Sequence, residues 1–302
     1  MDFAAVTAFV HAAELKSFTA AAAKLNLTAS AVSKAVSRLE TEVGVRLMNR
    51  TTRSLSLTAD GEAFLGRCRN ALAELEDARE MLARTGAAPR GLLRISLPLA
   101  YGRLVVVPEL TTLLACHTEL FIEASFSDRR VDLIEEGYDL AIRIGELPDS
   151  RLIARRIDTA RFVVCASPGY LARAGRPGDS AALREHTCIM CRSTSDGRMH
   201  AWRLPGPDGD VREIIPEARL IADYGEALVN AALADAGLIY IHRYMVEPLL
   251  IEGRLEIVLE DDARDAQGVF ALFPQTKSLS PRVRAVVDHL VRGAAVRKAT
   301  PD

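Results

Sequence analysis

The chain has 302 residues, 49% apolar and 26% charged, which allows two or three globular domains and excludes disorder throughout. Its 38 basic and 40 acidic residues give a net charge of −2, so the total does not indicate a nucleic-acid-binding protein. The charge is unevenly distributed, because residues 1–58 carry seven basic and four acidic side chains, a net +3. Residues 59–85 carry −2 and the remainder −3, so the positive charge lies at the N-terminal end.

The cysteines and the start of the chain indicate a reducing compartment. Five cysteines are an odd number in a chain too long to need disulfides. The first residues lack the positive region of a signal peptide, and we expect no apolar run to reach the roughly 18 residues of a membrane span. We predict a soluble cytoplasmic protein without a membrane partner. The six histidines are too dispersed for a metal site, so no metal or other cofactor is expected.

The first 58 residues are predicted to form short helices and a wing. Apolar residues at helical spacing predict a helix over residues 3–10. Ser17 can cap a second helix, and Thr28 a third that ends at Gly44. Alternation within residues 47–58 indicates a small two-stranded wing.

The third predicted helix has two different faces. Its apolar stripe consists of Val32, Val36, Leu39 and Val43. The opposite face carries short polar and basic side chains, namely Ser30, Ser33, Lys34, Ser37 and Thr41. One face is expected to pack and the other to be accessible.

Residues 59–85 predict one long helix. Its apolar seam consists of Leu65, Cys68, Leu72, Leu75 and Leu82. We expect this seam to pair with a second copy of the chain, because long helices need a partner to bury a seam. The alternative is a helix that lies on its own domain. Small residues and a proline at 86–91 then indicate a hinge.

Strands and helices alternate beyond the hinge, as in an α/β domain. Near-continuous apolar runs are typical of parallel strands covered on both faces. The predicted strands are residues 92–97, 120–126, 139–144, 161–166, 187–191, 238–242 and 269–273. The predicted helices are residues 102–114, 131–136, 225–236 and 281–291.

Residues 17–40 resemble the helix-turn-helix of LysR-type transcriptional regulators, and residues 44–53 and 57–61 resemble their wing and linker helix. Residues 131–143 and 163–168 are similar to their effector-binding domain. The resemblance implies a winged helix-turn-helix DNA-binding domain at 1–58, a dimerisation helix at 59–85, a hinge at 86–91 and an effector-binding α/β domain at 92–302. That domain would have two subdomains resembling periplasmic binding proteins, one from 92–161 and 267–302 and the other from 162–266.

The resemblance also implies a set of partners. These are double-stranded DNA with an imperfect palindrome, a small-molecule effector, and further copies of the chain as a dimer or a tetramer. RNA polymerase is a further partner open to such a regulator. The rival hypothesis is an α/β enzyme or a solute-binding protein, but the sequence shows no phosphate loop or nucleophile elbow and no signal peptide. We therefore expect a regulator and no catalytic residues.

The accessible face of the third helix suits a major groove, where slim side chains reach base edges and basic ones reach phosphates. Ser33 and Lys34 match the family's principal recognition positions. The predicted DNA-binding residues are Thr28, Ala29, Ser30, Ser33, Lys34, Ser37, Arg38, Arg50 and Arg53. Many members of the family have Gln and Pro where this chain has Ala29 and Ser30, so the bases read are expected to differ. The alternative is a solvated basic face.

The effector is expected at the carboxyl ends of the strands, where ligands of open α/β sheets bind. The predicted residues are Leu97, Pro98, Leu99, Ala100, Tyr101, Ser127, Asp128, Arg143, Ser193, Thr194, Asp223 and Tyr224. Arg143 could hold a carboxylate with two hydrogen bonds. The alternative is a structural ion pair of Arg143 with Asp128 or Asp139.

Cys188 and Cys191 have the spacing of a redox pair, and some LysR-type regulators sense oxidants through cysteines. In this chain the pair lies in a predicted strand, whose alternation directs the two thiols to opposite faces. We therefore favour structural burial over redox activity.

Overall fold

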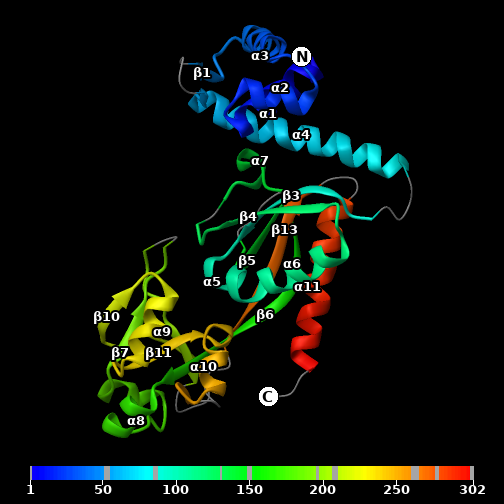
Figure 1. Cartoon of the computed structure of the whole chain (residues 1–302). Helices are drawn as coiled ribbons and strands as arrows, with labels where there is room; N and C mark the ends of the chain where they lie inside the picture. Colours follow the sequence, from blue (N-terminus) through cyan, green and yellow to red (C-terminus); the bar gives the residue numbers. More distant parts are fainter. Residues whose placement is uncertain are drawn as a thin grey trace.

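The computed structural model describes residues 2–50, 55–83, 88–129, 131–147, 152–194, 197–205, 210–259, 265–275 and 279–299. Figure 1 shows a helical N-terminal unit, a long helix below it and an α/β region in two parts. Both parts belong to one continuous sheet. The C-terminal helix packs against the part nearer the long helix. The fold is therefore mixed α/β with an all-helical N-terminal unit and a small wing.

The N-terminal unit contains α1 (Phe3–Leu15), α2 (Phe18–Leu25) and α3 (Ala29–Val43), followed by the antiparallel pair β1 (Met48–Arg50) and β2 (Leu55–Leu57). Ser17 Oγ accepts the Ala20 N–H at 3.2 Å. Thr28 Oγ1 accepts the Ala31 N–H at 3.2 Å. Gly44 adopts the left-handed conformation at a φ of 78° and ends α3. The predicted caps, helix end and wing are confirmed.

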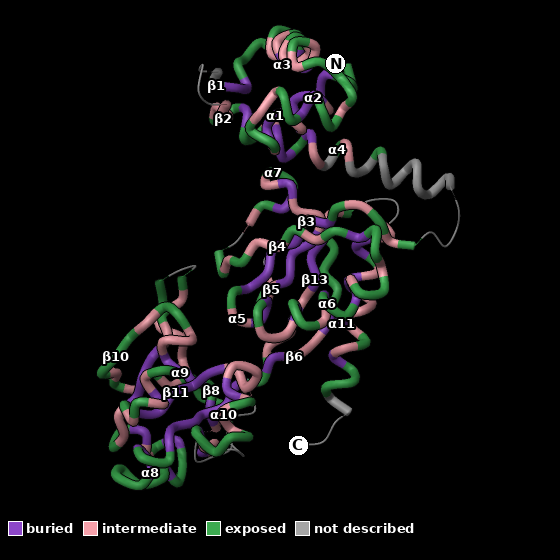
Figure 2. Tube along the Cα trace, in the orientation of Figure 1, coloured by how far each residue is buried: buried purple, intermediate pink, exposed green. Residues whose placement is uncertain are grey.

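The core of this unit lies where its helices cross. Phe9 is completely buried, as are Val32, Val36 and Leu39 of the predicted apolar stripe of α3. Figure 2 shows the buried faces of α1 and α2 turned toward one another, with the exposed face of α3 on the outside. The amphipathic pattern of α3 is thus satisfied within the unit.

Helix α4 (Ala59–Ala83) also contributes to this core, which corrects one prediction. Leu65 and Cys68 are buried against the N-terminal unit of the same chain, and Leu72 packs beside them half-buried. Leu65 and Cys68 are therefore already covered by their own chain, whereas Leu72 keeps part of its surface exposed. Leu75 is 52% exposed and remains available, and the side chain of Leu82 lies outside the described part.

The first half of the α/β region forms a parallel array in the order β4–β3–β5. Its elements are β3 (Gly91–Leu97), α5 (Leu99–Tyr101), the π-turn η1 (Gly102–Val106), α6 (Val107–Cys116), β4 (Leu120–Phe126), α7 (Leu133–Glu136) and β5 (Leu140–Ile144). The C-terminal α11 (Pro281–Ala299) packs against this array through Val283, Val286 and Leu290.

The second half contains the order β10–β7–β11 and a separate hairpin of β8 and β9. Its elements are α8 (Pro168–Ala174), η2 (Ser180–Glu185), β7 (Cys188–Cys191), β8 (Trp202–Pro205), β9 (Val211–Ile214), β10 (Ala218–Ala222), α9 (Gly225–Leu233), β11 (Leu238–His242), η3 (Arg243–Met245), α10 (Glu247–Ile251) and β12 (Glu256–Val258). Separate apolar clusters fill the two faces of this part of the sheet.

Two long antiparallel strands connect the halves, β6 (Leu152–Ala166) and β13 (Ala266–Pro274). The first part of β6, from Leu152 to Arg161, pairs with β13, and the part from Phe162 onward pairs with β11. The predicted strand over residues 161–166 was therefore too short. Its early part was missed because residues 153–156, including Arg155 and Arg156, are all exposed, so this part has no apolar pattern.

The sequence analysis expected no apolar run as long as a membrane span, and the helical stretch Leu99–Cys116 corrects that expectation. It spans 18 residues and is long and apolar enough to cross a membrane, by length and composition alone. In this structure the stretch lies against the sheet, and Tyr101, Val106 and Leu110 enter the apolar core of the first subdomain. Because 28% of its residues are buried, we interpret it as a helix that packs on the sheet with one apolar face.

The N-terminal unit and α4 lie directly on the first subdomain. An added Cβ at Gly66 of α4 would lie 1.8 Å from Glu135 O of α7, so the two backbones are in contact there. Beside this contact, Arg67 Nη2 lies 2.8 Å from Glu135 Oε1. Figure 1 shows α7 just beneath α4. The N-terminal unit and the first subdomain are thus joined by packing as well as by the chain.

Glu14 of α1 forms a second bridge between these parts. Its Oε1 accepts from Arg69 at 3.1 Å and from Arg94 of β3 at 2.7 Å. Burial raises the pKa of Glu14, but the hydrogen bond from Arg94 and the charges of both arginines outweigh it and lower the pKa. The carboxylate is therefore kept ionised between two cations.

Candidate functional site

The outer face of α3 is the first candidate site. Ser30 and Lys34 are exposed, and Ala29, Ser33 and Ser37 are half-buried on the same side of the domain's surface. Ser37 Oγ donates to Ser33 O at 3.0 Å, which keeps that side chain close to the helix. The face is slim and carries a cation, as a helix that enters a major groove requires.

The two ends of this face differ in the groups that could contact DNA phosphates. Thr28 Oγ1 lies 3.1 Å from Ser30 Oγ at the start of α3, beside the first-turn amides. Arg38 Nη2 lies 2.5 Å from Asp2 Oδ2, so a phosphate at Arg38 would compete with this exposed ion pair. Arg50 ends β1 with its side chain outside the described part, and Arg53 lies outside the described residues.

The second candidate site is a cavity of about 300 Å³ between the two subdomains. Its walls come from strand ends on both sides, as predicted from the positions of the polar loops. The predicted residues that line it are Pro98, Leu99, Ala100, Ser127, Asp128, Arg143, Ser193, Thr194, Asp223 and Tyr224. Leu99 and Tyr224, which are 125 positions apart in the sequence, thus line the same cavity.

Leu97 and Tyr101 do not line this cavity. Both side chains are buried in the core of the first subdomain, and Tyr101 Oη donates to Asp158 Oδ2 at 2.9 Å. The helical turn after Pro98 carries Tyr101 to the inner side of the helix, away from the strand end. These two residues were included because they flank a loop that does line the cavity.

Other residues also line the cavity, namely Ile144, Cys191, Arg192, Gly225, Glu226, His242, Tyr244, Met245 and Gln267. Ile144 belongs to a strand end that the sequence indicated and His242 follows a strand near the expected cleft, but the others were not predicted. Ile144, Arg192 and Gly225 directly adjoin predicted residues, and Cys191 and Glu226 lie two positions from one. His242, Tyr244 and Met245 lie at or just after the end of the predicted strand 238–242, so a wider window around each strand end would have included all of these. Gln267 had no such signal, because it lies within the antiparallel β13 rather than at a parallel strand's end.

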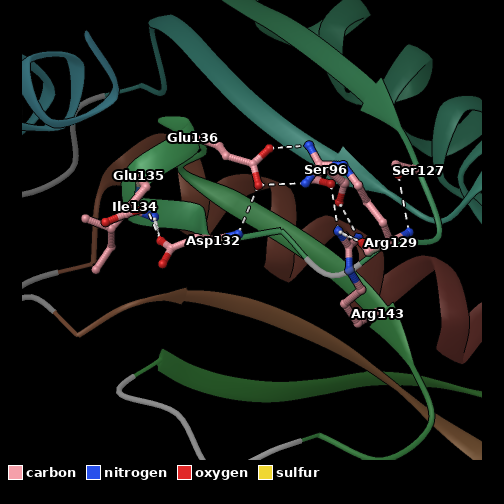
Figure 3. Close-up of polar contacts among 8 residues, drawn as sticks. All are labelled: Ser96, Ser127, Arg129, Asp132, Ile134, Glu135, Glu136 and Arg143. Atoms are coloured by element: carbon pink, nitrogen blue, oxygen red, sulfur yellow. Dashed lines mark hydrogen bonds and ion pairs between the residues drawn. The ribbon is translucent and has the colours of Figure 1, made fainter. Parts of the chain in front are cut away.

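Arg143 lines this cavity, and its guanidinium is held by neutral oxygens (Figure 3). Its guanidinium donates to Ser96 Oγ at 2.8 Å, to Ile142 O at 2.6 Å and to Arg129 O at 3.4 Å. Among the described residues no carboxylate accepts a hydrogen bond from this guanidinium, so the alternative of a structural ion pair with Asp128 or Asp139 is not found. Burial lowers the pKa of Arg143, and the charge of Asp128 opposes that shift.

The two acids have other partners. Asp128 Oδ1 accepts the Leu99 N–H at 3.0 Å, and Asp139 Oδ2 accepts the Arg94 N–H at 2.7 Å. Both carboxylates therefore hydrogen-bond backbone amides, and Asp128 acts on Arg143 through its charge alone. A half-buried guanidinium with only neutral acceptors around it is well suited to an anionic ligand.

Arg129 connects this site to α7. Its guanidinium pairs with both carboxylate oxygens of Glu136, and its carbonyl accepts from Arg143. Glu136 Oε1 also accepts the Asp132 N–H at 3.1 Å, and Asp132 in turn caps α7 (Figure 3). The cavity and the helix that touches α4 are therefore part of one hydrogen-bonded segment.

The cysteine pair is free. Cys188 is buried and Cys191 is half-buried in β7, and burial raises the pKa of both thiols, that of Cys188 to about 12. Such thiols are poor nucleophiles, which favours the structural interpretation. Among the described residues, no group of three or more His, Cys, Asp or Glu side chains could hold a metal ion.

A winged helix-turn-helix joined through a long helix to a two-part α/β domain with a cavity between its parts defines a ligand-responsive DNA-binding regulator. Sequence comparison places it more narrowly. The model described as "Bacterial regulatory helix-turn-helix protein, lysR family" matches residues 3–62, and "LysR substrate binding domain" matches residues 86–295. The chain belongs to the LysR family of transcriptional regulators.

Relatives agree with this assignment. An HTH-type transcriptional regulator of Xanthomonas campestris pv. campestris is 34% identical over 94% of this chain and 83% of its own length. The transcriptional activator AaeR of Escherichia coli is 33% identical over 94% of this chain and 91% of its own length. These relatives are regulators, so the rival hypothesis of an enzyme is wrong.

Solved structures show the same architecture. The LysR-type regulator CrgA of Neisseria meningitidis aligns with a TM-score of 0.61 at 31% identity, over 97% of this chain and 99% of that one. The virulence activator AphB of Vibrio cholerae aligns with a TM-score of 0.59 at 24% identity, over 97% and 99%, which supports the fold.

Proposed function

We propose that this regulator binds operator DNA through α3 and the wing, and that a small carboxylate effector in the cavity between the subdomains controls it. The observation that carries the effector class is Arg143, a half-buried cation in the cavity wall with neutral acceptors around it. Two copies paired through α4 near Leu75 would present two α3 helices to an imperfect palindrome. Two such dimers would form a tetramer, and RNA polymerase would be a further partner. The proposed regulator acts in the cytoplasm.

The proposed signal runs through α7. A carboxylate on Arg143 would compete for the donors that now reach Ser96 and the Arg129 carbonyl. Because Arg129 also holds Glu136, a shift of Arg129 moves the cap of α7, and α7 touches α4 at Gly66. Effector binding would thereby bias the angle of α4 relative to the regulatory domain, a population shift between two arrangements.

Lys34→Ala is expected to weaken specific operator binding by about 10-fold to 100-fold, since one good contact to a base edge contributes about 1–3 kcal/mol. The measurement is a mobility-shift titration with operator and unrelated DNA. Arg219→Ala is the control, because it removes one exposed positive charge from β10 in the regulatory domain. Unchanged affinity and selectivity in Lys34→Ala would exclude the assigned role of Lys34.

Arg143→Ala is expected to lower the affinity for carboxylate effectors by about 10-fold or more, because hydrogen bonds to charged groups contribute about 1.5–3 kcal/mol. Isothermal titration of the full chain with a panel of monocarboxylates measures this. Arg192→Ala, at an arginine that lines the cavity from the second subdomain, is the matched control. Tight binding that survives Arg143→Ala would leave Arg143 with a structural role only.

A further inference from the structure

The cavity between the subdomains is lined by charged side chains of both signs. They are the cations Arg143 and Arg192 and the carboxylates Asp128, Asp223 and Glu226. Glu226 is already neutralised, because Arg103 pairs with its Oε1 and Tyr224 Oη donates to its Oε2 at 2.5 Å. The other four form no ion pair with any residue that the structure describes. Opposite charges thus line this cavity without neutralising one another by direct contact.

The sheet places Asp128 and Arg143 at the same end of β3. This strand lies between β4, which Asp128 follows by two positions, and β5, which contains Arg143. Neighbouring strands are 4.7–4.9 Å apart, so the backbones of β4 and β5 are about 10 Å apart. The Arg143 guanidinium reaches across β3 to the carbonyl of Arg129, the residue after Asp128 (Figure 3). A cation and a carboxylate therefore lie close together with no hydrogen bond between them.

A second carboxylate faces the cavity from the other subdomain. Asp223 follows β10 directly and is exposed, and within the described part of the chain it has no hydrogen-bond partner. Burial raises the pKa of the Cys191 thiol, and the charges of Asp223 and Asp128 add to that shift. Both carboxylates are thus close enough to one side chain to act on it, although they belong to opposite subdomains. A positive group between them would meet a carboxylate on either side.

These charges restrict the ligand that the cavity can bind. An acid with a carboxylate alone would place its negative charge beside Asp128, which repels it. A positive group attached next to the ligand's carboxylate removes this repulsion and can itself donate to the carboxylates of the wall. In an α-amino acid the ammonium and carboxylate groups share one carbon atom, so both fit beside each other. Leu99, Ile144 and Met245 contribute apolar surface for the rest of the ligand.

We propose that the effector is an α-amino acid, whose carboxylate lies on Arg143 and whose ammonium group lies between Asp128 and Asp223. This inference rests on the proposed function of the cavity and names the chemical class of its ligand. Asp128 and Asp223 select the amino group, whereas Arg143 binds the carboxylate. Because the two aspartates belong to opposite subdomains, the ammonium group would hold the subdomains together.

The test uses the full-length protein and pairs of acids with the same carbon skeleton. One member of each pair is an amino acid found in proteins, and the other has hydrogen in place of the amino group, such as valine beside isovalerate and phenylalanine beside hydrocinnamate. Isothermal titration is expected to show at least one pair in which the amino acid binds about 10-fold or more tightly, because hydrogen bonds to charged groups are strong.

Asp128→Asn removes the charge but keeps a side-chain oxygen that can accept the Leu99 N–H. In D128N the amino acid of that pair is expected to bind about 10-fold more weakly, since a charged hydrogen bond is lost, and its partner acid more tightly than in the wild type. Loss of folded protein cannot change the two affinities in opposite directions. Glu119→Gln is the control, because it removes a negative charge from the exposed residue before β4, outside the cavity, and is expected to change neither affinity.

Two results would overturn this inference. They are equal binding of both members of every pair by the wild type, and a preference for the amino acid that D128N leaves unchanged. In both cases acids still bind and Arg143→Ala still weakens them, so the proposed function of the cavity stands. If neither kind of acid binds the wild type, the proposed effector class fails and the inference fails with it.

Discussion

Phe9→Ala is expected to abolish operator binding by unfolding the N-terminal unit. Phe9 is completely buried in the core between α1, α3 and α4, and its ring centroid lies 5.7 Å from that of Phe64. Removing a buried phenylalanine typically costs about 3–5 kcal/mol, a large part of the roughly 5–15 kcal/mol that stabilises a domain. Urea denaturation followed by circular dichroism measures the loss, and mobility shift measures DNA binding.

The same helix supplies the control for this substitution. Phe3 lies at the start of α1 and is 53% exposed. Phe3→Ala therefore truncates a phenylalanine on the surface rather than one in the core. It is expected to change stability by less than about 0.5–1 kcal/mol and to leave operator affinity unchanged. Normal DNA binding by Phe9→Ala would show that this core does not hold the unit together.

Gly66→Ala is expected to force α4 and α7 apart. The new Cβ would lie 1.8 Å from Glu135 O and 2.7 Å from its carbonyl carbon, and backbone atoms cannot rotate away. In an exposed helix the same substitution would stabilise by about 1 kcal/mol, whereas overpacking costs about 1–3 kcal/mol. We therefore expect a lower thermal midpoint and a weaker effect of bound acid on operator affinity.

Gly178→Ala is the matched control, because no atom lies within 4 Å of the added Cβ and the backbone there needs no special conformation. Its thermal midpoint is expected to equal that of the wild type. A Gly66→Ala protein as stable as wild type, whose DNA binding responds to acid as before, would contradict both the tight contact and the proposed signal through α7.

Features that depend on neighbours in sequence were predicted well. Ser17 and Thr28 were identified as helix caps because a side-chain hydroxyl can accept a hydrogen bond from the backbone N–H three residues later. This contact is local and does not depend on distant parts of the chain. Gly44 was identified as a helix end for a similarly local reason. The polar loops at Pro98 and Ser127 were placed at one site because parallel strands bring their carboxyl ends to the same edge.

Features that depend on distant partners were predicted less well. The seam of α4 was recognised as apolar, but Leu65 and Cys68 are covered by α1 of the same chain rather than by a second copy. Arg143 was recognised as a charged residue that needs acceptors, but Ser96 and the Arg129 carbonyl supply them rather than an acid. In both cases several neighbours were chemically suitable, and only packing selected among them.

The sequence by itself determined the class of this protein. The +3 charge of residues 1–58, the capped helices and the two faces of α3 all follow from local order along the chain. The tertiary structure decided the rest. Arg143 and His242 meet in one cavity only because β6 and β13 carry the chain between two subdomains. A periodic apolar pattern shows that one face of a helix or strand must be covered, and a buried polar atom must find a hydrogen-bond partner. In both cases the covering or bonding group comes from elsewhere in the fold.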